Sequence, residues 1–564
     1  MFKKVNPLVI ILAVALIIRV WGINHNFPDV NRYFYETEEH SSIQIAMGFG
    51  GGDLNPHSFN KPTLLYYLLF IFYGGFYLLG KLVGLFAGVA DFVRFYFYNT
   101  WVFYLIGRIF SVILGLGSIF LLYLTGKKVF SKKSGLVAAA MLAVAPLHVE
   151  FSQLALTDIL GLFLAMFAIY YALRANQDFS LNNVAASGFF SGLAMSAKYH
   201  YGFCVLALAL VMLLQLIKAK SWSGSFFKKA FAGWGCLITG FVFGTPFAVL
   251  DHKYFLASIL ELQRAKAGAG LEILSQRHLI PNWWIEHIFQ LADKNALGIG
   301  LLAVSLSGVI FAAWRHRRKD IVLLAIIVFF YSFFSISKWH WSPAHYLLLI
   351  VPYSLLLGAE LIVKLFSKFK PGSPWPAALL SLILIPPFLT AGINDNLRSR
   401  PDTKARAKQW IEANIPAGAR ILMDKIYVPQ LSLTKESLKM LTDMRLANQS
   451  ILLPTYREIK SKNKYADLRD QSLTQRGTPY NIYTIERDAV MNIAEYKQKY
   501  NIEYVIISSL AKNSYINVVP FNINKETMSE FYKSVENNCT LIREFLPNSI
   551  NLLGPSRIEI YKVN

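Results

Sequence analysis

Charged residues are scarce in this chain: they make up 16% of its 564 residues, whereas a soluble protein usually carries about 25%. Cysteine is rarer still, with three residues, of which Cys204 and Cys236 lie in apolar runs and Cys539 lies near the end. Their spacing predicts neither a disulfide framework nor a zinc site. We therefore interpret the cysteines as packing residues.

The chain contains long apolar runs with few charged residues, and 54% of its residues are hydrophobic. Such runs are typical of membrane spans, since about 20 apolar residues cross the hydrocarbon core. We predict about eleven spans, at residues 7–23, 109–126, 134–149, 158–173, 184–197, 201–217, 230–250, 296–314, 320–336, 345–363 and 375–393. The first run lacks a small-residue cleavage site, which indicates a retained span and not a signal peptide.

The basic residues outnumber the acidic ones and give the chain a formal net charge of +22. They gather in short patches between spans, such as 126–133, 218–229 and 315–319, as expected for cytoplasmic loops. This distribution argues against a nucleic-acid partner and predicts a multi-pass protein of the cell or inner membrane with a cytoplasmic N-terminus. The predicted outer loop 252–295 is also basic, which either weakens the rule there or marks binding of an anionic ligand.

The predicted fold class is a polytopic α-helical membrane protein with a small C-terminal α/β domain. Residues 1–393 form the transmembrane domain, and its first outer loop, 24–108, carries interfacial or re-entrant helices. After residue 394, the pattern predicts an amphipathic helix over 402–414 and strands at 502–510 and 557–563. We expect residues 394–564 to form an extracytoplasmic domain that supports the structure or binds an acceptor.

Polar residues at the mouths of several spans fall on the outer side of the membrane in this topology. Ionisable residues at membrane depth are costly and usually face a polar cavity or one another. The residues concerned include Glu36, Glu38, Glu39, Asp53, Lys61, Asp158, Lys198, Asp251, His340 and His345. A carboxylate can act as a general base, and a lysine can hold a leaving phosphate. Carboxylates without nearby His or Cys ligands could also take a divalent cation such as Mg²⁺ or Mn²⁺, although no cofactor is certain.

Each of these signals also has a purely structural interpretation. The glutamates at 36–39 could form a solvated loop face, and Thr157 or Asp158 could cap the helix that follows. Lys198 could extend to the membrane interface, and His345 lies among aromatic residues typical of an interfacial belt. The stretch "GFGGGD" (48–53) lacks the ending of a phosphate-binding P-loop and is interpreted as a flexible turn.

Five motifs occur in order along the chain: "EEHSSIQIAMGFGGGDLNPHSFNKPTLLYYL" (38–68), "LALTDILGLFLAMFAIYYAL" (154–173), "SGLAMSAKYHYG" (191–202), "GTPFAVLDHKYF" (244–255) and "SISKWHWSPAHYLLLIVP" (335–352). These motifs resemble the GT-C superfamily of membrane glycosyltransferases. The similarity is to the phospholipid-carrier-dependent group that includes protein O-mannosyltransferases and the bacterial aminoarabinose transferase of lipid A. Together with the linker at 402–422, the motifs are distributed in order over most of the span from residue 1 to residue 425.

The resemblance implies transfer of a sugar from a polyprenyl- or dolichyl-phosphate carrier, usually with inversion at the anomeric carbon. The acceptor would be a protein, a lipid or a polysaccharide on the outer face of the membrane. The implied catalytic residues are Glu38 as the base, Glu39 as its neighbour and Asp158 as the second-loop acid. The implied donor-binding residues are Lys61 and Lys198 for the phosphate, together with Asp53, Tyr199 and His345.

The chain departs from the family pattern at two positions. The family usually has Asp where this chain has Glu38, so Glu36 competes for the role of base. His345 stands where the family has Arg, so a phosphate contact there would depend on pH.

A lipid-linked oligosaccharide flippase or a secondary transporter is the alternative from another functional class. Transporters usually show internal repeats with broken spans at corresponding positions, and we find no such pair in the sequence. A structural anchor for the outer domain is a third interpretation, against which the acids and lysines at the span mouths count.

Overall fold

The computed structural model describes most of the chain. The described residues are 6–24, 37–219, 223–261, 283–336, 344–398, 403–424, 428–429, 431–440, 478–485, 491–509, 511–512, 525–546 and 557–564. Glu36 and His340, two of the candidate residues, therefore lie outside the described residues.

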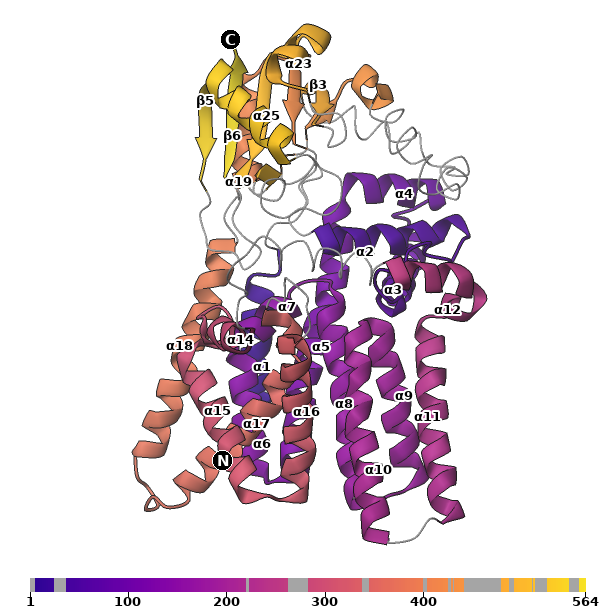
Figure 1. The fold of residues 1–564 in the computed structure, drawn as a ribbon, viewed down its shortest axis with the longest axis vertical. Helices are drawn as coiled ribbons and strands as arrows, with labels where there is room; N and C mark the ends of the chain where they lie inside the picture. The colour runs from indigo at the N-terminus through magenta and orange to yellow at the C-terminus, as the bar shows by residue number, and fades with distance from the viewer. Residues whose placement is uncertain are drawn as a thin grey trace. The chain divides into compact units, whose positions relative to one another are not determined.

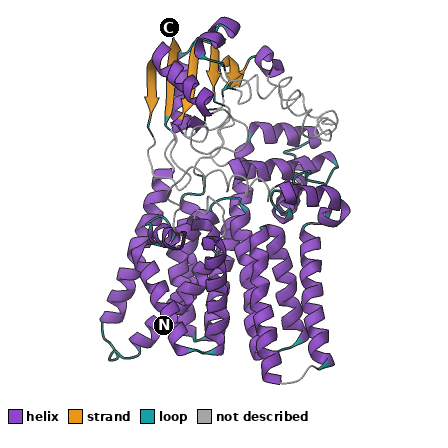
Figure 2. Cartoon of the chain, in the orientation of Figure 1, coloured by secondary structure: helices purple, strands orange, loops and turns teal. Residues whose placement is uncertain are grey.

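The chain divides into two compact units, and we describe each by itself. Unit 1 comprises Met1–Ile23, Ser41–Phe72 and Ile106–Asp395, and unit 2 comprises Asn24–His40, Tyr73–Leu105 and Asn396–Asn564. Figure 2 shows that helices dominate the chain and that the strands belong to its C-terminal part.

Most helices belong wholly or mainly to unit 1 (Figure 1). They are α1 (Pro7–Trp21), α5 (Thr100–Val129), α6 (Lys132–Val144), α7 (Pro146–Ser152), α8 (Thr157–Gln177), α9 (Leu181–Ala197), α10 (Val205–Ala219), α11 (Gly224–Gly244), α12 (Phe247–Leu250), α14 (Trp283–Ala292), α15 (Gly298–Arg315), α16 (Arg318–Ile336), α17 (Ile350–Phe366) and α18 (Trp375–Arg398). Short 3₁₀ turns occur at η1 (Phe49–Gly51), η2 (Tyr199–Cys204) and η3 (Ala344–Leu347).

Each predicted apolar run contains a helix or a pair of helices. Among the described residues, 8 helices are long and apolar enough to cross a membrane, or up to 9 if the bent pair α6–α7 is one span. The 8 helices include Leu64–Leu82, which the sequence predicts as an interfacial or re-entrant part of the first outer loop and not as a span; the others correspond to predicted spans. Three more predicted spans correspond to shorter helices, α1 with 15 residues and α9 and α17 with 17 residues each. The helical membrane architecture is therefore confirmed.

One predicted span, 134–149, is broken in the structure. Helices α6 and α7 meet at 66°, next to Pro146, which has no N–H to donate. The amide of Leu147 donates to the carbonyl of Ala296, and the guanidinium of Arg19 donates to the carbonyl of Ala143 at 3.0 Å. A buried side chain thus satisfies a backbone group at the break, as an apolar environment requires.

Helix α9 packs between α8 and α11 (Figure 1). Glycines permit this close approach: a Cβ atom at Gly188 would lie 2.0 Å from the carbonyl oxygen of Gly233. A Cβ atom at Gly240 would lie 2.2 Å from the carbonyl oxygen of Phe189. Small residues of this kind are typical of membrane helix interfaces. They allow α9, which ends one residue before Lys198, to pack closely against α11.

The region between the first two spans contains α2 (Thr37–Gly48), α3 (Leu64–Leu82) and α4 (Val89–Tyr98). The first half of α3 belongs to unit 1, and Figure 1 views it nearly end-on while α8 to α11 are seen from the side. The second half of α3, α4 and the start of α5 share an aromatic cluster in unit 2, in which Phe103 contacts Phe92 at 5.5 Å and Tyr96 at 5.0 Å.

The C-terminal part of unit 2 is a small α/β fold. Its strands are β1 (Arg420–Met423), β2 (Ser432–Leu433), β3 (Pro479–Thr484), β4 (Tyr504–Ser508), β5 (Cys539–Phe545) and β6 (Ile558–Val563), in the order β2-β3-β1-β4-β6-β5. The pairs among β2, β3, β1 and β4 are parallel, and β6 pairs antiparallel with β4 and β5. Helix α19 (Thr403–Asn414) packs in one core cluster, and α23 (Ile493–Tyr500) and α25 (Lys525–Asn538) pack in the other. The predicted helix and both predicted strands are confirmed.

Asp424 follows β1 and is buried within this fold. Its carboxylate accepts hydrogen bonds from the amide of Ser508 at 2.8 Å and from the hydroxyl of Tyr532 at 2.8 Å. Burial raises the pKa of Asp424 to about 7, although these two hydrogen bonds act in the opposite direction. The carboxyl group of Asp424 therefore connects β1 to β4 and α25 through hydrogen bonds. Its ionised form is destabilised by burial near neutral pH.

We expect the α/β fold to lose stability as the pH rises. The folded chain keeps the Asp424 proton up to about pH 7, whereas the unfolded chain releases it near pH 4, so stabilisation is full below the lower value and lost above the higher. Between about pH 5.5 and pH 8, the loss amounts to about 2 kcal/mol. Pulse proteolysis of the full-length protein in urea, with detection of the C-terminus, measures it. An Asp424→Asn variant with the same pH dependence as wild type would contradict this assignment.

Candidate functional site

The candidate site in unit 1 is built on an ion pair between Asp158 and Lys198. Asp158 lies in the first turn of α8, and its Oδ1 is 2.6 Å from Nζ of Lys198. The side chains are 2% and 14% exposed, so the two charges compensate each other largely out of water. Helix α8 has no side-chain cap hydrogen bond. The N-cap residue of α8 is Leu156, so the interpretation of Thr157 or Asp158 as the cap is wrong, and the Asp158 carboxylate pairs with Lys198.

Aromatic and imidazole rings surround this ion pair. Nζ of Lys198 lies 5.1 Å from the ring centroid of Tyr346, within the range of a cation–π contact. His345, next to it in η3, packs against Phe151 with ring centroids 4.9 Å apart. His345 and His200 both interact electrostatically with Asp158. Residues from three separate segments, at α8, the end of α9 and η3, thus meet at one place.

The loop that carries Asp53 and Lys61 is anchored to the same unit. The carboxylate of Asp53 is 60% exposed and lies 2.7 Å from Nε2 of His57. Nδ2 of Asn55 donates to Asp251 at 2.8 Å. The hydroxyl of Tyr199 donates to the carbonyl of Phe59 at 2.9 Å, and Lys61 lies half-buried two residues further on. Tyr199 therefore connects the loop of Lys61 to the segment of Lys198.

The glutamates of the first motif belong to unit 2, where they lie in α2. Glu38 is exposed, whereas the side chain of Glu39 is fully buried. The neighbouring His40 lies with Nδ1 3.0 Å from the hydroxyl of Tyr104. In the first turn of α2, only Glu38 of the two acids is open to an external molecule.

The chemical groups of unit 1 suit a phosphate ester. Lysine ammonium groups and imidazoles are positively charged or can become so, and they stabilise phosphate oxygens. Within the described ranges, no group of three or more His, Cys, Asp or Glu side chains is placed to hold a metal ion. The divalent cation considered from the sequence thus stays a prediction.

A second buried polar cluster was not predicted from the sequence. Arg19 Nη2 lies 2.7 Å from Nδ1 of His148, and Gln153 Nε2 donates to the carboxylate of Asp395 at 3.1 Å. All four side chains are at most 1% exposed. An arginine inside the first apolar run was the available signal, because it falls within a segment expected to span the membrane.

These features define a helical chain with several candidate membrane spans, in which a buried ion pair joins Asp158 to Lys198. The model of the dolichyl-phosphate-mannose-protein mannosyltransferase family matches residues 98–242, which contain Asp158 and Lys198, and this match confirms the resemblance found in the sequence. Among solved structures, archaeal oligosaccharyltransferase AglB from Archaeoglobus fulgidus, in complex with an inhibitory peptide and a dolichol-phosphate, has a similar fold. The TM-score is 0.50 at 12% identity, over 95% of this chain and 72% of that chain.

A second solved structure, ArnT from Cupriavidus metallidurans bound to undecaprenyl phosphate, aligns over 98% of this chain and 97% of that chain. Its TM-score is 0.49 and its sequence identity is 11%. The search of curated protein sequences found no match.

Proposed function

We propose that the protein is an integral-membrane glycosyltransferase that moves a sugar from a polyprenyl-phosphate carrier to an acceptor on the outer face of the membrane. The observation that carries this proposal is the Asp158–Lys198 pair, with His345 beside it, in the segment that matches the mannosyltransferase family model. The dolichol-phosphate in the complex of the oligosaccharyltransferase with the similar fold supports a lipid-phosphate donor. The acceptor is a protein, a lipid or a polysaccharide.

The proposed reaction is a single displacement at the anomeric carbon. Glu38 takes the proton from the acceptor group as that group attacks, with Glu39 as its neighbour, and the bond from the sugar to the phosphate oxygen breaks. Lys61 and Lys198 stabilise the charge of the departing polyprenyl phosphate, and this displacement inverts the anomeric centre. The exposure of Glu38 supports its role, because an acceptor has to reach the base.

The remaining candidates complete the proposed donor site. His345 contacts the phosphate or the sugar and makes donor binding pH-dependent. Tyr199 holds the Lys61 loop through its bond to Phe59, and Asp53 lies on the same loop. A divalent cation, Mg²⁺ or Mn²⁺, would assist by neutralising phosphate charge, and its need is tested by adding a chelator to the assay.

We expect Lys61→Ala to weaken donor use more than acceptor use. Loss of one ammonium from a phosphate clamp should raise the KM for the polyprenyl-phosphate sugar about tenfold or more, because hydrogen bonds between charged groups contribute about 1.5–3 kcal/mol. Initial rates in proteoliposomes at varied donor and acceptor concentrations separate the two effects. The exposed Lys81 provides a matched control, since Lys81→Ala should leave both KM values close to wild type. An unchanged donor KM for Lys61→Ala would remove Lys61 from the clamp.

The proposed topology has about eleven spans, with residues 394–564 on the outer side. The three native cysteines are replaced by serine, and a single cysteine is then introduced at Ser131 or at Gly50. The proposed topology places these two positions on opposite sides of the membrane. A membrane-impermeant maleimide should label intact cells at Gly50→Cys, because that position is exposed in the first outer loop. Ser131→Cys should react only after the cells are permeabilised. Labelling of Ser131→Cys in intact cells would invert the proposed orientation.

A further inference from the structure

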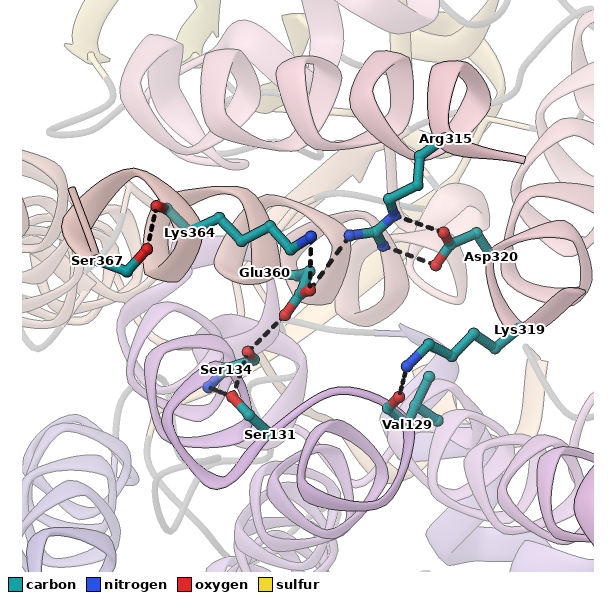
Figure 3. Close-up of polar contacts among 9 residues, drawn as sticks. All are labelled: Val129, Ser131, Ser134, Arg315, Lys319, Asp320, Glu360, Lys364 and Ser367. Atoms are coloured by element: carbon teal, nitrogen blue, oxygen red, sulfur yellow. Dashed lines mark hydrogen bonds and ion pairs between the residues drawn. The ribbon is translucent and has the colours of Figure 1, made fainter. Parts of the chain in front are cut away.

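A network of buried charged side chains connects several helices at one end of unit 1. The guanidinium of Arg315 makes a two-pronged ion pair with Asp320, with N–O distances of 2.6 and 2.7 Å (Figure 3). Its third nitrogen donates to Glu360 at 3.2 Å, and the hydroxyl of Ser134 donates to the same carboxylate at 2.8 Å. The charged side chains in this core are at most 8% exposed. The network therefore joins α15, α16, α17 and the start of α6.

The same network brings two basic turns side by side. Figure 3 shows Lys319, just inside α16, donating to the carbonyl of Val129 at the end of α5. Two cations make cation–π contacts with Phe130, the residue after Val129. Nζ of Lys319 lies 4.9 Å and the guanidinium carbon of Arg315 lies 5.2 Å from the centroid of its ring. The α5–α6 turn and the α15–α16 turn thus share an aromatic contact, although about 190 residues separate them in the chain.

The exposed charges on these two turns are all positive. They are Lys127, Lys128, Lys132, Lys133, Arg317 and Arg318, and we call this set the double basic turn. The acids within residues 126–134, 315–320 and 360–370 are Asp320 and Glu360, and both are buried in ion pairs with Arg315. Because Asp320 and Glu360 are buried in ion pairs with Arg315, no exposed carboxylate in these three ranges offsets the positive charge of the double basic turn.

Apolar side chains border the double basic turn. Trp314, in the last turn of α15, is 77% exposed, and Ile310, one turn earlier, is 69% exposed. Exposed tryptophan next to basic residues at the end of a membrane helix is typical of the headgroup level of a bilayer. The combination of cations with an adjacent apolar helix surface fits a lipid better than a soluble polyanion.

We propose that the double basic turn binds the headgroups of anionic phospholipids in the leaflet at this end of the bundle. The phosphates are held by the lysines and arginines, while the acyl chains run along the exposed faces of the adjacent helices. The buried Arg315–Asp320–Glu360 network holds the two turns together and so forms one surface from two loops. This binding is independent of the proposed sugar transfer.

The unmodified protein provides the first test. Purified protein is placed in nanodiscs of phosphatidylcholine alone or of phosphatidylcholine with phosphatidylglycerol, and lysines are acylated and quantified by mass spectrometry. Lys132 and Lys133 should be protected by the anionic lipid, and added salt should reduce the protection. Lys533, an exposed lysine of α25 in the α/β fold, is the internal control. Equal reactivity of Lys132 and Lys133 in both lipids, or equal protection of Lys533, would overturn the proposal.

Paired variants provide the second test. Detergent-solubilised protein is titrated with phosphatidylglycerol, and native mass spectrometry measures its affinity for the lipid. The double variant Lys132→Gln with Lys133→Gln should lower this affinity about thirtyfold, and Arg317→Gln with Arg318→Gln should lower it by a similar factor. The control variant Lys497→Gln with Lys499→Gln removes the same charge from exposed positions of α23 in the α/β fold and should bind as wild type does. Equal losses in the test and control variants would show that only net charge matters and would contradict a defined surface.

Discussion

Replacement of Glu38 by glutamine is expected to lower the rate of sugar transfer by about 10²–10⁴-fold, the usual contribution of a general base. Glutamine has nearly the same size and cannot accept the acceptor proton, so the loss should fall on kcat with little change in the donor KM. Transfer from a polyprenyl-phosphate sugar by purified protein in proteoliposomes measures both constants.

Glu36→Gln is the control for the base assignment, because it makes the same change two residues earlier. It should retain near wild-type transfer, while Glu38→Asp should retain part of the activity, since it keeps the carboxylate that the family usually carries as Asp. A large loss in Glu36→Gln together with an active Glu38→Gln would move the base to Glu36.

Asp158→Asn is expected to abolish transfer and also to destabilise unit 1. The change leaves the Lys198 ammonium, which is 14% exposed, without its carboxylate at 2.6 Å. Breaking a buried pair on one side typically costs about 3–5 kcal/mol. Transfer should fail because Lys198 is no longer held where the donor phosphate would bind. Thermal melting in detergent and the proteoliposome assay measure the two effects.

The double variant Asp158→Asn with Lys198→Met separates folding from function. Removing both charges should restore most of the thermal stability, because no buried charge is left unpaired. Transfer should stay absent, since both proposed functional groups are gone. A double variant that melts like wild type and still transfers sugar would show that the pair serves only the fold.

The helical architecture could be predicted because apolar runs of bilayer length, repeated through a chain of low charge, are typical of membrane-spanning helices. The break between α6 and α7 could not be located in this way. Pro146 marks a weak point in the helix, but the bend depends on Arg19 and Ala296, which satisfy backbone groups from distant parts of the chain.

The motifs predicted Asp158, Lys198 and His345 as site residues, but the contacts of these side chains could not be derived from the sequence. Asp158 and Lys198 are 40 residues apart, and they meet because α8 packs against α9, a contact that a local sequence pattern does not predict. Capping of α8 by Asp158 was as consistent with the local sequence as the ion pair that the structure contains.

The basic turns show the same limit at the other end of unit 1. Their charge predicted a loop position, because lysine and arginine favour cytoplasmic loops. The merging of the two turns depends on Phe130 and on the buried partners of Arg315, and local sequence patterns do not predict such long-range contacts.

Sugar transfer by the wild-type protein tests the central claim most directly. Purified protein in proteoliposomes is supplied with polyprenyl-phosphate sugars labelled in the sugar and with acceptor fractions from the cell envelope. The label should move from the lipid carrier to an acceptor, with release of free polyprenyl phosphate and an inverted anomeric linkage. If the labelled donor instead crosses the bilayer intact while no acceptor is labelled, the protein is a flippase and the proposed transferase activity is contradicted.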